Sequence, residues 1–307
     1  MMPLGSALHH LLNRFSILEI IGGWMPGDVF PAFFEMEMLQ RALIASVLVT
    51  VVAGLYGTYL MLRNLSLIGD GLAHVSFGGV AVGVTVGAVA PLSYALGFSI
   101  VASIIIYELQ SREIVTGDTS IAIFLTGMLA FGLVVLRLFS QGITTDIEGY
   151  LFGSLVLVDT YSLNLITWIS FFALLGLALF HRALLAITVD HVAARMQGIP
   201  VHAVGLWFSI TVATIVVSMV QVIGALLVTA LLVTPAATAQ LVSRSFRGSL
   251  LWTQVFGLSS TFIGLYLSAE LNTGSGSMIA LVAATIFALV GMLRFANTHI
   301  KPFDSSQ

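Results

Sequence analysis

The sequence consists of long apolar runs separated by short polar links. Most runs approach the roughly 20 residues that a helix needs to cross the hydrocarbon core of a bilayer. Runs of this kind occupy residues 39–62, 69–89, 91–109, 120–140, 160–180, 250–267 and 278–295. The pattern therefore predicts a series of membrane-spanning helices rather than a water-soluble fold.

A further apolar stretch, residues 201–242, is too long for one span. Gln221 and Gly224 mark the expected break between a sixth and a seventh span. The seventh contains Thr234-Pro235 within its apolar run, and a proline there frees a backbone carbonyl that neighbours must satisfy. Two spans here give nine in all, and one broken span gives eight. The predicted fold is all-α and polytopic, with eight to nine transmembrane helices.

Composition supports this prediction. Of the 307 residues, 58% are hydrophobic and 8% are charged, whereas soluble domains are about 25% charged. So few charges cannot cover a water-exposed surface, and we expect a multi-pass protein of the cytoplasmic or inner membrane. The net charge of −3 gives no basic surface for nucleic acid. The chain has no cysteine, which excludes disulfides, thiolate metal sites and cysteine nucleophiles.

Lys301 is the only lysine, and no Gly-Lys-Ser/Thr sequence is present. A phosphate-binding P-loop needs that sequence, so any ATP that the function consumes must be bound by another chain.

The basic residues indicate an orientation. If the link after the fifth span is cytoplasmic, nine spans place eight of the eleven basic residues inside: Arg63, Arg112, Arg182, Arg195, Arg244, Arg247, Arg294 and Lys301. This bias fits the positive-inside rule and predicts an outside N-terminus and an inside C-terminus.

The predicted domain layout is an N-terminal segment at 1–38, a transmembrane domain at 39–296 and a tail at 297–307. Within the first segment, residues 7–24 are expected to lie on the membrane surface, and residues 141–159 read as a loop with an interfacial or re-entrant piece.

A short polar helix is expected between the fifth and sixth spans, at about 189–201. Asp190 is a suitable N-cap for the sequence HVAARMQ, while Gly198 and Pro200 end the helix. From these residues alone it is either a simple link or a contact surface for a separate ATPase subunit.

One polar pair stands out in the second span, within the sequence LIGDGLAHVSFGGVAVG (67–83). Asp70 and His74 are four residues apart and share one helix face. Carboxylate oxygen and imidazole nitrogen can hold a divalent cation, and Gly78 and Ala81 allow another backbone to approach the same face. The alternatives are a structural metal site or a polar pair at the membrane edge, with Asp70 in a salt bridge to Arg63.

The ligand count limits what this pair can do. Two ligands do not complete a metal shell, but two copies of the chain would supply two Asp and two His side chains. An intramembrane metalloenzyme would need a third ligand and a general base, and no His-Glu-x-x-His is present. The pair lies beside an inner-side link, so either the span begins deeper than hydropathy suggests or the pair acts as a late gate.

Three segments together resemble one family. They are LRNLSLIGDGLAHVSFGGVAVG (62–83), VDHVAARMQGIPV (189–201) and VIGALLVTALLVTPAATAQL (222–241). The Gly-Asp-x-x-x-His element and the Thr-Pro-Ala-Ala-Thr-Ala run are distinctive in combination. Over residues 39–296 the chain resembles the membrane permease subunits of ABC importers for zinc, manganese or iron.

The resemblance implies a permease of the cobalamin-importer-like type that has no enzymatic activity and no permanently bound cofactor. Its partners would be cytoplasmic ATPase subunits, an extracellular or periplasmic metal-binding protein, a second permease copy and membrane lipid. The transported ion would be Mn²⁺, Zn²⁺ or Fe²⁺, contacted by Asp70 and His74.

In the same resemblance, the polar helix becomes the coupling helix, with ATPase contacts expected at Asp190, His191, Ala194, Arg195 and Gly198. The chain departs from the family by having Asp190-His191 in place of an acidic pair or Pro-Glu, and by its longer N-terminus. Gln221, Thr229 and Thr234 are candidates to line the path, or else to make hydrogen bonds between helices.

Two alternative functions remain open. A permease for a metal chelate, such as a siderophore or cobalamin, would need a wide cavity and no ligand pair. A secondary transporter would need no coupling helix. The sequence does not decide the metal, because Asp and His suit all three ions.

Overall fold

The protein is described here from a computed structural model, which covers residues 4–6, 9, 27, 29–88, 90–139, 145–153 and 158–300. Within these residues every regular element is helical. Seven helices are long and apolar enough to cross a membrane: α4 (Glu37–Leu62), α6 (Pro91–Ser111), α7 (Gly117–Phe139), α9 (Thr160–Val189), α11 (Val201–Ile223), α14 (Phe246–Glu270) and α15 (Ser275–Ile300). The chain is therefore an all-α, multi-pass membrane protein.

Shorter helices complete the bundle. Two of them form one apolar stretch, Val228–Val242, made of α12 (Val228–Leu232) and α13 (Thr234–Val242), with the 3-10 turn η2 (Ala225–Leu227) before it. The inner helix α5 (Ile68–Thr85) is not among the seven. The remaining helices are α3 (Ala32–Glu35), α8 (Thr145–Phe152) and α10 (His191–Met196).

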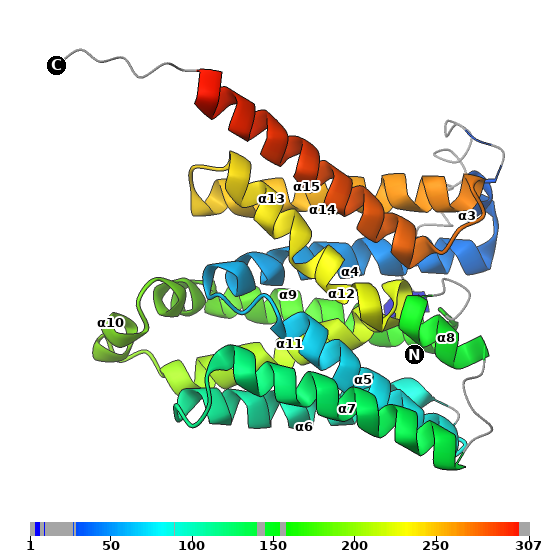
Figure 1. Ribbon diagram of the computed structural model, residues 1–307, viewed down its shortest axis with the longest axis horizontal. Helices are drawn as coiled ribbons and strands as arrows, with labels where there is room; N and C mark the ends of the chain where they lie inside the picture. The colour runs from blue at the N-terminus through cyan, green and yellow to red at the C-terminus, as the bar shows by residue number, and fades with distance from the viewer. Residues whose placement is uncertain are drawn as a thin grey trace.

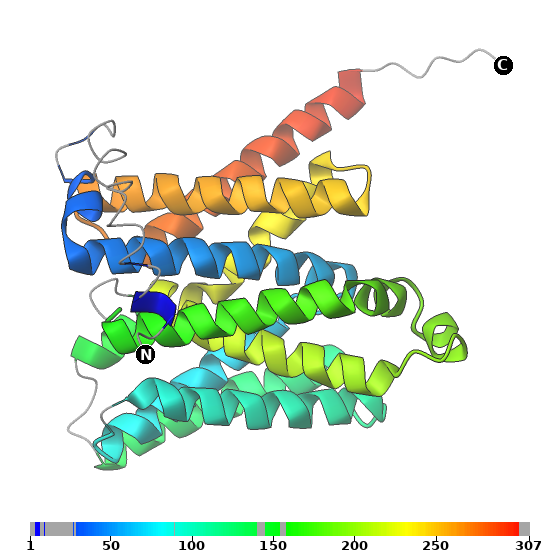
Figure 2. The ribbon, with the colours of Figure 1, turned by 180° about the vertical axis from the view of Figure 1, so that it is seen from behind.

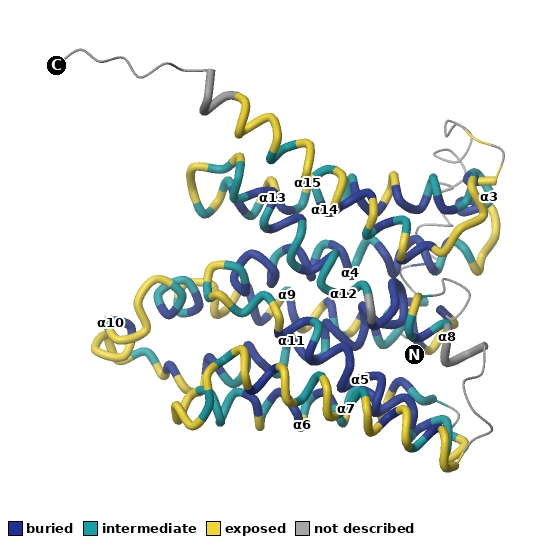
Figure 3. Tube along the Cα trace, in the orientation of Figure 1, coloured by how far each residue is buried: buried dark blue, intermediate teal, exposed yellow. Residues whose placement is uncertain are grey.

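Most of the long helices lie side by side, and α15 crosses them at an angle (Figures 1 and 2). The short helix α10 and the C-terminal end of α15 lie at one end, and α3 and α8 lie at the other (Figure 1). Burial is concentrated along α4, α5 and α11, whereas α10 is mostly exposed (Figure 3).

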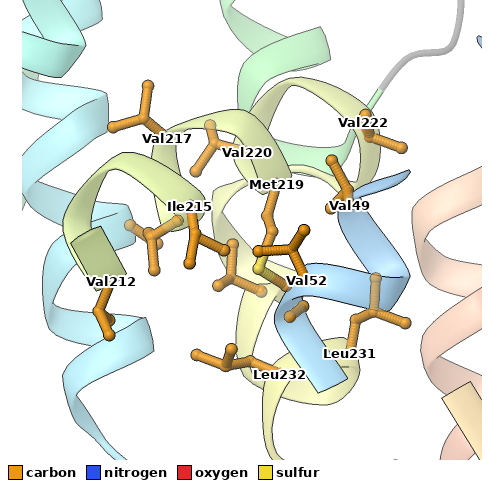
Figure 4. Close-up of a cluster of buried hydrophobic side chains, with 14 of the residues drawn as sticks. Val49, Val52, Val212, Ile215, Val217, Met219, Val220, Val222, Leu231 and Leu232 are labelled. Atoms are coloured by element: carbon orange, nitrogen blue, oxygen red, sulfur yellow. The ribbon is translucent and has the colours of Figure 1, made fainter. Parts of the chain in front are cut away.

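The centre of the bundle is aliphatic. Val49 and Val52 of α4 lie among Ile215 and Met219 of α11 and Leu231 of α12 (Figure 4). Lipid tails are as apolar as these side chains, so their contribution in the membrane is close packing rather than removal from water. The core therefore fixes how α4, α11 and α12 fit together.

Five helices end in the same hydrogen-bonded turn. In each, a residue with positive φ follows the last turn, and the next amide donates to the carbonyl five residues earlier, as Leu65 N does to Leu60 O at 2.9 Å. This is the Schellman motif. Its positive-φ residues are Asn64, Gly87, Glu113, Gly198 and Asn272, which end α4, α5, α6, α10 and α14.

Most helix boundaries fall where the apolar runs predict them, with two notable differences. The fifth run does not stop at His181 and Arg182, because α9 continues to Val189, where Asp190 ends it. No helix breaker stands between these points, and a helix tolerates exposed charges once it has left the bilayer. The loop at 141–159 contains the helix α8.

The long apolar stretch is divided as predicted. Helix α11 ends at Gly224, whose φ of 85° turns the chain, and α13 begins at Thr234-Pro235. The surface segment expected at 7–24 falls, apart from residue 9, outside the described residues, as do residues 301–307 of the tail.

Candidate metal site and coupling helix

Helix α5 is the inner helix of the bundle, with fourteen of its eighteen residues buried. Glycines let its neighbours approach closely. A Cβ on Gly71 would lie 2.7 Å from Ile121 of α7, one on Gly79 would lie 2.7 Å from Ala95 Cα of α6, and one on Gly69 would lie 2.7 Å from Leu232 of α12. Three neighbouring helices therefore surround α5.

Asp70 and His74 lie on the part of α5 between two of these neighbours. Successive residues of a helix are about 100° apart. Asp70 therefore points between α12, which Gly69 faces, and α7, which Gly71 faces. His74 lies one turn further on the same side. The structure thus places the two predicted ligands on one face, between α12 and α7.

Neither Asp70 nor His74 makes a contact, among the described residues, that would explain a polar side chain in this apolar bundle. His74 is 6% exposed, and its Nδ1 atom is buried without a hydrogen-bond partner. The Asp70 charge acts on His74, and within the described residues Asp70 makes no ion pair. The alternative of a salt bridge to Arg63 is not observed, because the Arg63 guanidinium instead lies 5.2 Å from the centre of the Phe208 ring.

The pair lies inside the bundle rather than at its rim. Figure 1 shows that α5 begins well short of the end marked by α10. Ile68, the first residue of α5, lines the same cavity as Phe208 and Val212, which are seven and eleven residues into α11. At 1.5 Å per residue, these positions lie roughly 10–16 Å beyond the start of α11.

The turn after α4 explains this depth. Asn64 has a φ of 55°, and the turn at its position sends residues 65–67 back into the bundle before α5 begins. Hydropathy places the second span at about the right residues but does not reveal that its start is recessed.

Within the described residues, one chain offers only Asp70 and His74 as candidate ligands at this position. Among the described residues, no group of three or more His, Asp or Glu side chains could hold a metal ion. The Asp70 and His74 pair therefore needs groups from elsewhere to complete a coordination shell.

The three path candidates differ in their surroundings. Gln221 is 2% exposed, and its amide donates to Ser162 of α9. Thr229, on α12, has a buried hydroxyl without a partner. Thr234 is the first residue of α13, and its backbone carbonyl oxygen accepts a hydrogen bond from the Thr238 hydroxyl at 2.8 Å.

The polar helix has the predicted local structure. The Asp190 carboxylate accepts hydrogen bonds from Val192 N at 2.8 Å and Ala193 N at 3.0 Å, so it caps α10. Gly198, with a φ of 80°, ends the helix. His191 and Arg195 are exposed, and Ala194 is buried against the bundle. Helix α10 therefore presents an exposed surface at one end of the molecule (Figure 3), in which Val192 and Met196 lie beside the polar side chains.

A cavity of about 670 Å³ lies behind α10, and no sequence motif indicates it. Its walls come from four separate parts of the chain: the link after α4, the end of α6, α10 and the first turns of α11. Only the fold brings them together.

Comparisons with known proteins agree over most of the chain. The profile of the ABC 3 transport family matches residues 35–294. The manganese import system permease protein ScaB of Streptococcus gordonii is 31% identical over 270 residues, which are 87% of this chain and 95% of that protein. The manganese transport system membrane protein MntC of Halalkalibacterium halodurans is 34% identical over 260 residues, 85% of this chain and 88% of that protein.

Two solved structures have similar folds. A chain of PsaBC from Streptococcus pneumoniae, solved in complex with Fab, is 30% identical, with a TM-score of 0.72 over 82% of this chain and 90% of that one. A metal-chelate type ABC transporter in an inward-facing conformation has a TM-score of 0.70 over 93% of this chain and 97% of that one. At 14% identity the second shows likeness of fold alone.

Proposed function

Since this chain belongs to the ABC 3 transport family, we propose that it is the membrane permease of an ATP-driven importer for a divalent transition metal ion. Manganese is the first candidate, because several relatives that share at least 30% identity over most of their length are named for manganese import or manganese transport. Zinc and iron(II) remain chemically compatible with the same ligands.

The observation that carries this proposal is the Asp70 and His74 pair. Placing an ionisable pair inside an apolar bundle costs free energy, so a function is expected for a pair that is found there. Here the carboxylate and the imidazole share one face of the inner helix, and His74 Nδ1 has no protein partner. Asp70 would supply an anionic oxygen and neutral His74 a nitrogen, which together suit a divalent transition metal.

A second copy of the permease, or a related one, would complete the site. Two chains that face each other across the α7 and α12 side of α5 would bring two Asp70 and two His74 side chains together. Four ligands shared between two subunits would bind the ion. They would also allow its release, since the ligands of one subunit separate from those of the other when the subunits move apart.

Helix α10 would connect this site to ATP hydrolysis. It packs between α9 and α11, and α11 packs directly on α5. A cytoplasmic ATPase that contacts α10, through Asp190, His191 and the Gly198 turn, would therefore act on the helix that carries the ligands. An extracellular metal-binding protein would deliver the ion at the opposite end.

We further infer nine crossings, with α12 and α13 together forming the seventh. This count puts α10 and the C-terminal end of α15 on the cytoplasmic side. Because the chain has no native cysteine, single cysteines at Ser111 and Asn272 can be labelled from one side at a time. The proposed topology requires Ser111→Cys to react only from the inside and Asn272→Cys only from the outside.

The function is tested by uptake into proteoliposomes that contain the permease, its ATPase and its binding protein. We expect Asp70→Asn and His74→Gln each to lower manganese uptake at least tenfold, equivalent to about 1.4 kcal/mol. The matched controls are Asp118→Asn and His181→Gln, which change exposed residues outside the site and should retain uptake.

Three outcomes separate the alternatives. Uptake that survives both ligand substitutions, at normal protein levels, would remove Asp70 and His74 from the path. Uptake driven by an ion gradient without ATP would indicate a secondary transporter. Competition by a siderophore complex or cobalamin, but not by free zinc or iron(II), would indicate a chelate permease.

A further inference from the structure

The cavity behind α10 contains an unusual arrangement of charge. Three arginines line it, Arg63, Arg112 and Arg195. Arg112 is paired, with its Nε 3.0 Å from Glu108 Oε2. His202 Nε2 lies 3.1 Å from the other oxygen of the same carboxylate. Glu108 is thus shared between Arg112 and His202, while Glu113, the other carboxylate of the lining, is exposed and makes no ion pair among the described residues.

Arg63 and Arg195 make no ion pair with any residue that the structure describes. Both line the same cavity as Tyr107, whose hydroxyl donates to the His202 backbone carbonyl at 3.1 Å. Arg63 is partly buried, and burial lowers the pKa of its guanidinium below the ordinary value, because the charged form has lost hydration. Two guanidinium groups that line one cavity without a carboxylate partner among the described residues can together bind an oxyanion.

The rest of the lining indicates what kind of oxyanion fits. The inner wall of the cavity is apolar, formed by Leu65, Ile68, Phe208 and Val212. Its charged rim lies where helices leave the bundle, since Arg63 directly follows α4 and Arg112 directly follows α6. A polar rim over an apolar floor, at the level where helices leave the bilayer, matches an amphiphile.

We propose that this cavity binds the phosphate headgroup of an anionic phospholipid from the cytoplasmic leaflet. Arg63 and Arg195 hold the phosphate, and the apolar wall accepts the start of an acyl chain. The proposal rests on the orientation inferred above. Because the cavity joins α10 to the link that leads into α5, a bound lipid would tie the proposed coupling helix to the helix that carries Asp70.

The test is lipid binding by the purified full-length chain, which needs neither metal nor ATP and so stands apart from any test of transport. The detergent-solubilised protein is titrated with phosphatidylglycerol or with phosphatidylcholine, and bound lipid is counted by native mass spectrometry alongside the apparent Tm. We expect phosphatidylglycerol to raise the Tm more than phosphatidylcholine does. Arg63→Gln and Arg195→Gln should each remove most of that difference.

Matched variants give the result its meaning. Arg63→Lys keeps the charge and should retain part of the effect, while Arg182→Gln removes an exposed charge outside the cavity and should retain all of it. If Arg63→Gln does not fold, the exposed Arg195 still provides the test. Equal stabilisation by the two lipids, or an undiminished preference in Arg195→Gln, would overturn the proposal. Stabilisation by inorganic phosphate or glycerol 3-phosphate but not by phosphatidylglycerol would overturn the assignment to lipid.

Discussion

Replacing Gly79 by alanine tests the close packing around α5. A Cβ at this position would lie 2.7 Å from Ala95 Cα and 2.9 Å from Tyr94 O, both on the backbone of α6. Ordinary contact begins at about 3.4 Å, so the two helices must separate by about 0.7 Å, the difference between 3.4 and 2.7 Å. Backbone atoms cannot rotate away as a flexible side chain can, so the whole helix must shift.

The facing helix offers a matched control. Gly97 of α6 has nothing within 4 Å of its would-be Cβ. Gly97→Ala therefore gains the same helix propensity, about 0.5–1 kcal/mol, without crowding. The difference between the two variants isolates the overpacking, which typically costs about 1–3 kcal/mol.

The assay is the apparent Tm of both purified variants at one scan rate. At about 2–4 °C per kcal/mol, we expect Gly79→Ala to unfold roughly 5 °C below Gly97→Ala. Because α5 carries Asp70, metal uptake by Gly79→Ala should also fall. If the two variants unfold at the same temperature, the close approach of α5 and α6 does not exist as described.

Three further predictions use the same measurements. Asp190→Ala removes both N-cap hydrogen bonds of α10, costing that helix about 1 kcal/mol, and should reduce metal-stimulated ATPase activity of the assembled transporter. Thr50→Val removes the 2.8 Å hydroxyl contact with Thr261 between α4 and α14 and should lower stability by about 0.6 kcal/mol, seen as a small fall in Tm. Glu113→Gly relieves a φ of 56° at the end of α6 and should raise stability by about 1 kcal/mol, seen as a rise in Tm.

Each of these variants has a control in the same chain. Asp159→Ala removes an equivalent N-cap from α9 at the opposite end, and an equal loss of ATPase activity there would contradict a specific role for α10. Thr126→Val changes an exposed hydroxyl that bonds only to its own helix and should be neutral. Ser111→Gly, in the helical last turn of α6, should destabilise. If it stabilises as Glu113→Gly does, backbone strain is not the cause.

The hydrophobic pattern predicts helix positions well because a bilayer imposes both length and composition on each span. It fails for α9 beyond Phe180 because the helix continues into water, where the apolar signal ends but the backbone hydrogen bonding does not. Turn residues are also predicted correctly from the sequence: Asp190, Gly198 and Gly224 stand at the predicted cap, stop and break.

The sequence predicts only part of the geometry of the candidate metal site. The spacing of Asp70 and His74 places them on one helix face in any register. Their depth depends on the reversal at Asn64, and a left-handed asparagine cannot be distinguished in the sequence from an ordinary one. The arginine-lined cavity is invisible to sequence reasoning, because its walls come from residues about 150 positions apart and share no motif.

The uninterrupted length of α9 has a mechanical consequence. Thirty residues at 1.5 Å each make a rod of about 45 Å, longer than the roughly 30 Å hydrocarbon core of a bilayer. One end carries α10, and near the other end Ser162 receives the hydrogen bond from Gln221. Because α9 is one uninterrupted helix, a displacement of α10 would move the whole of α9 and so be transmitted to the opposite side of the membrane.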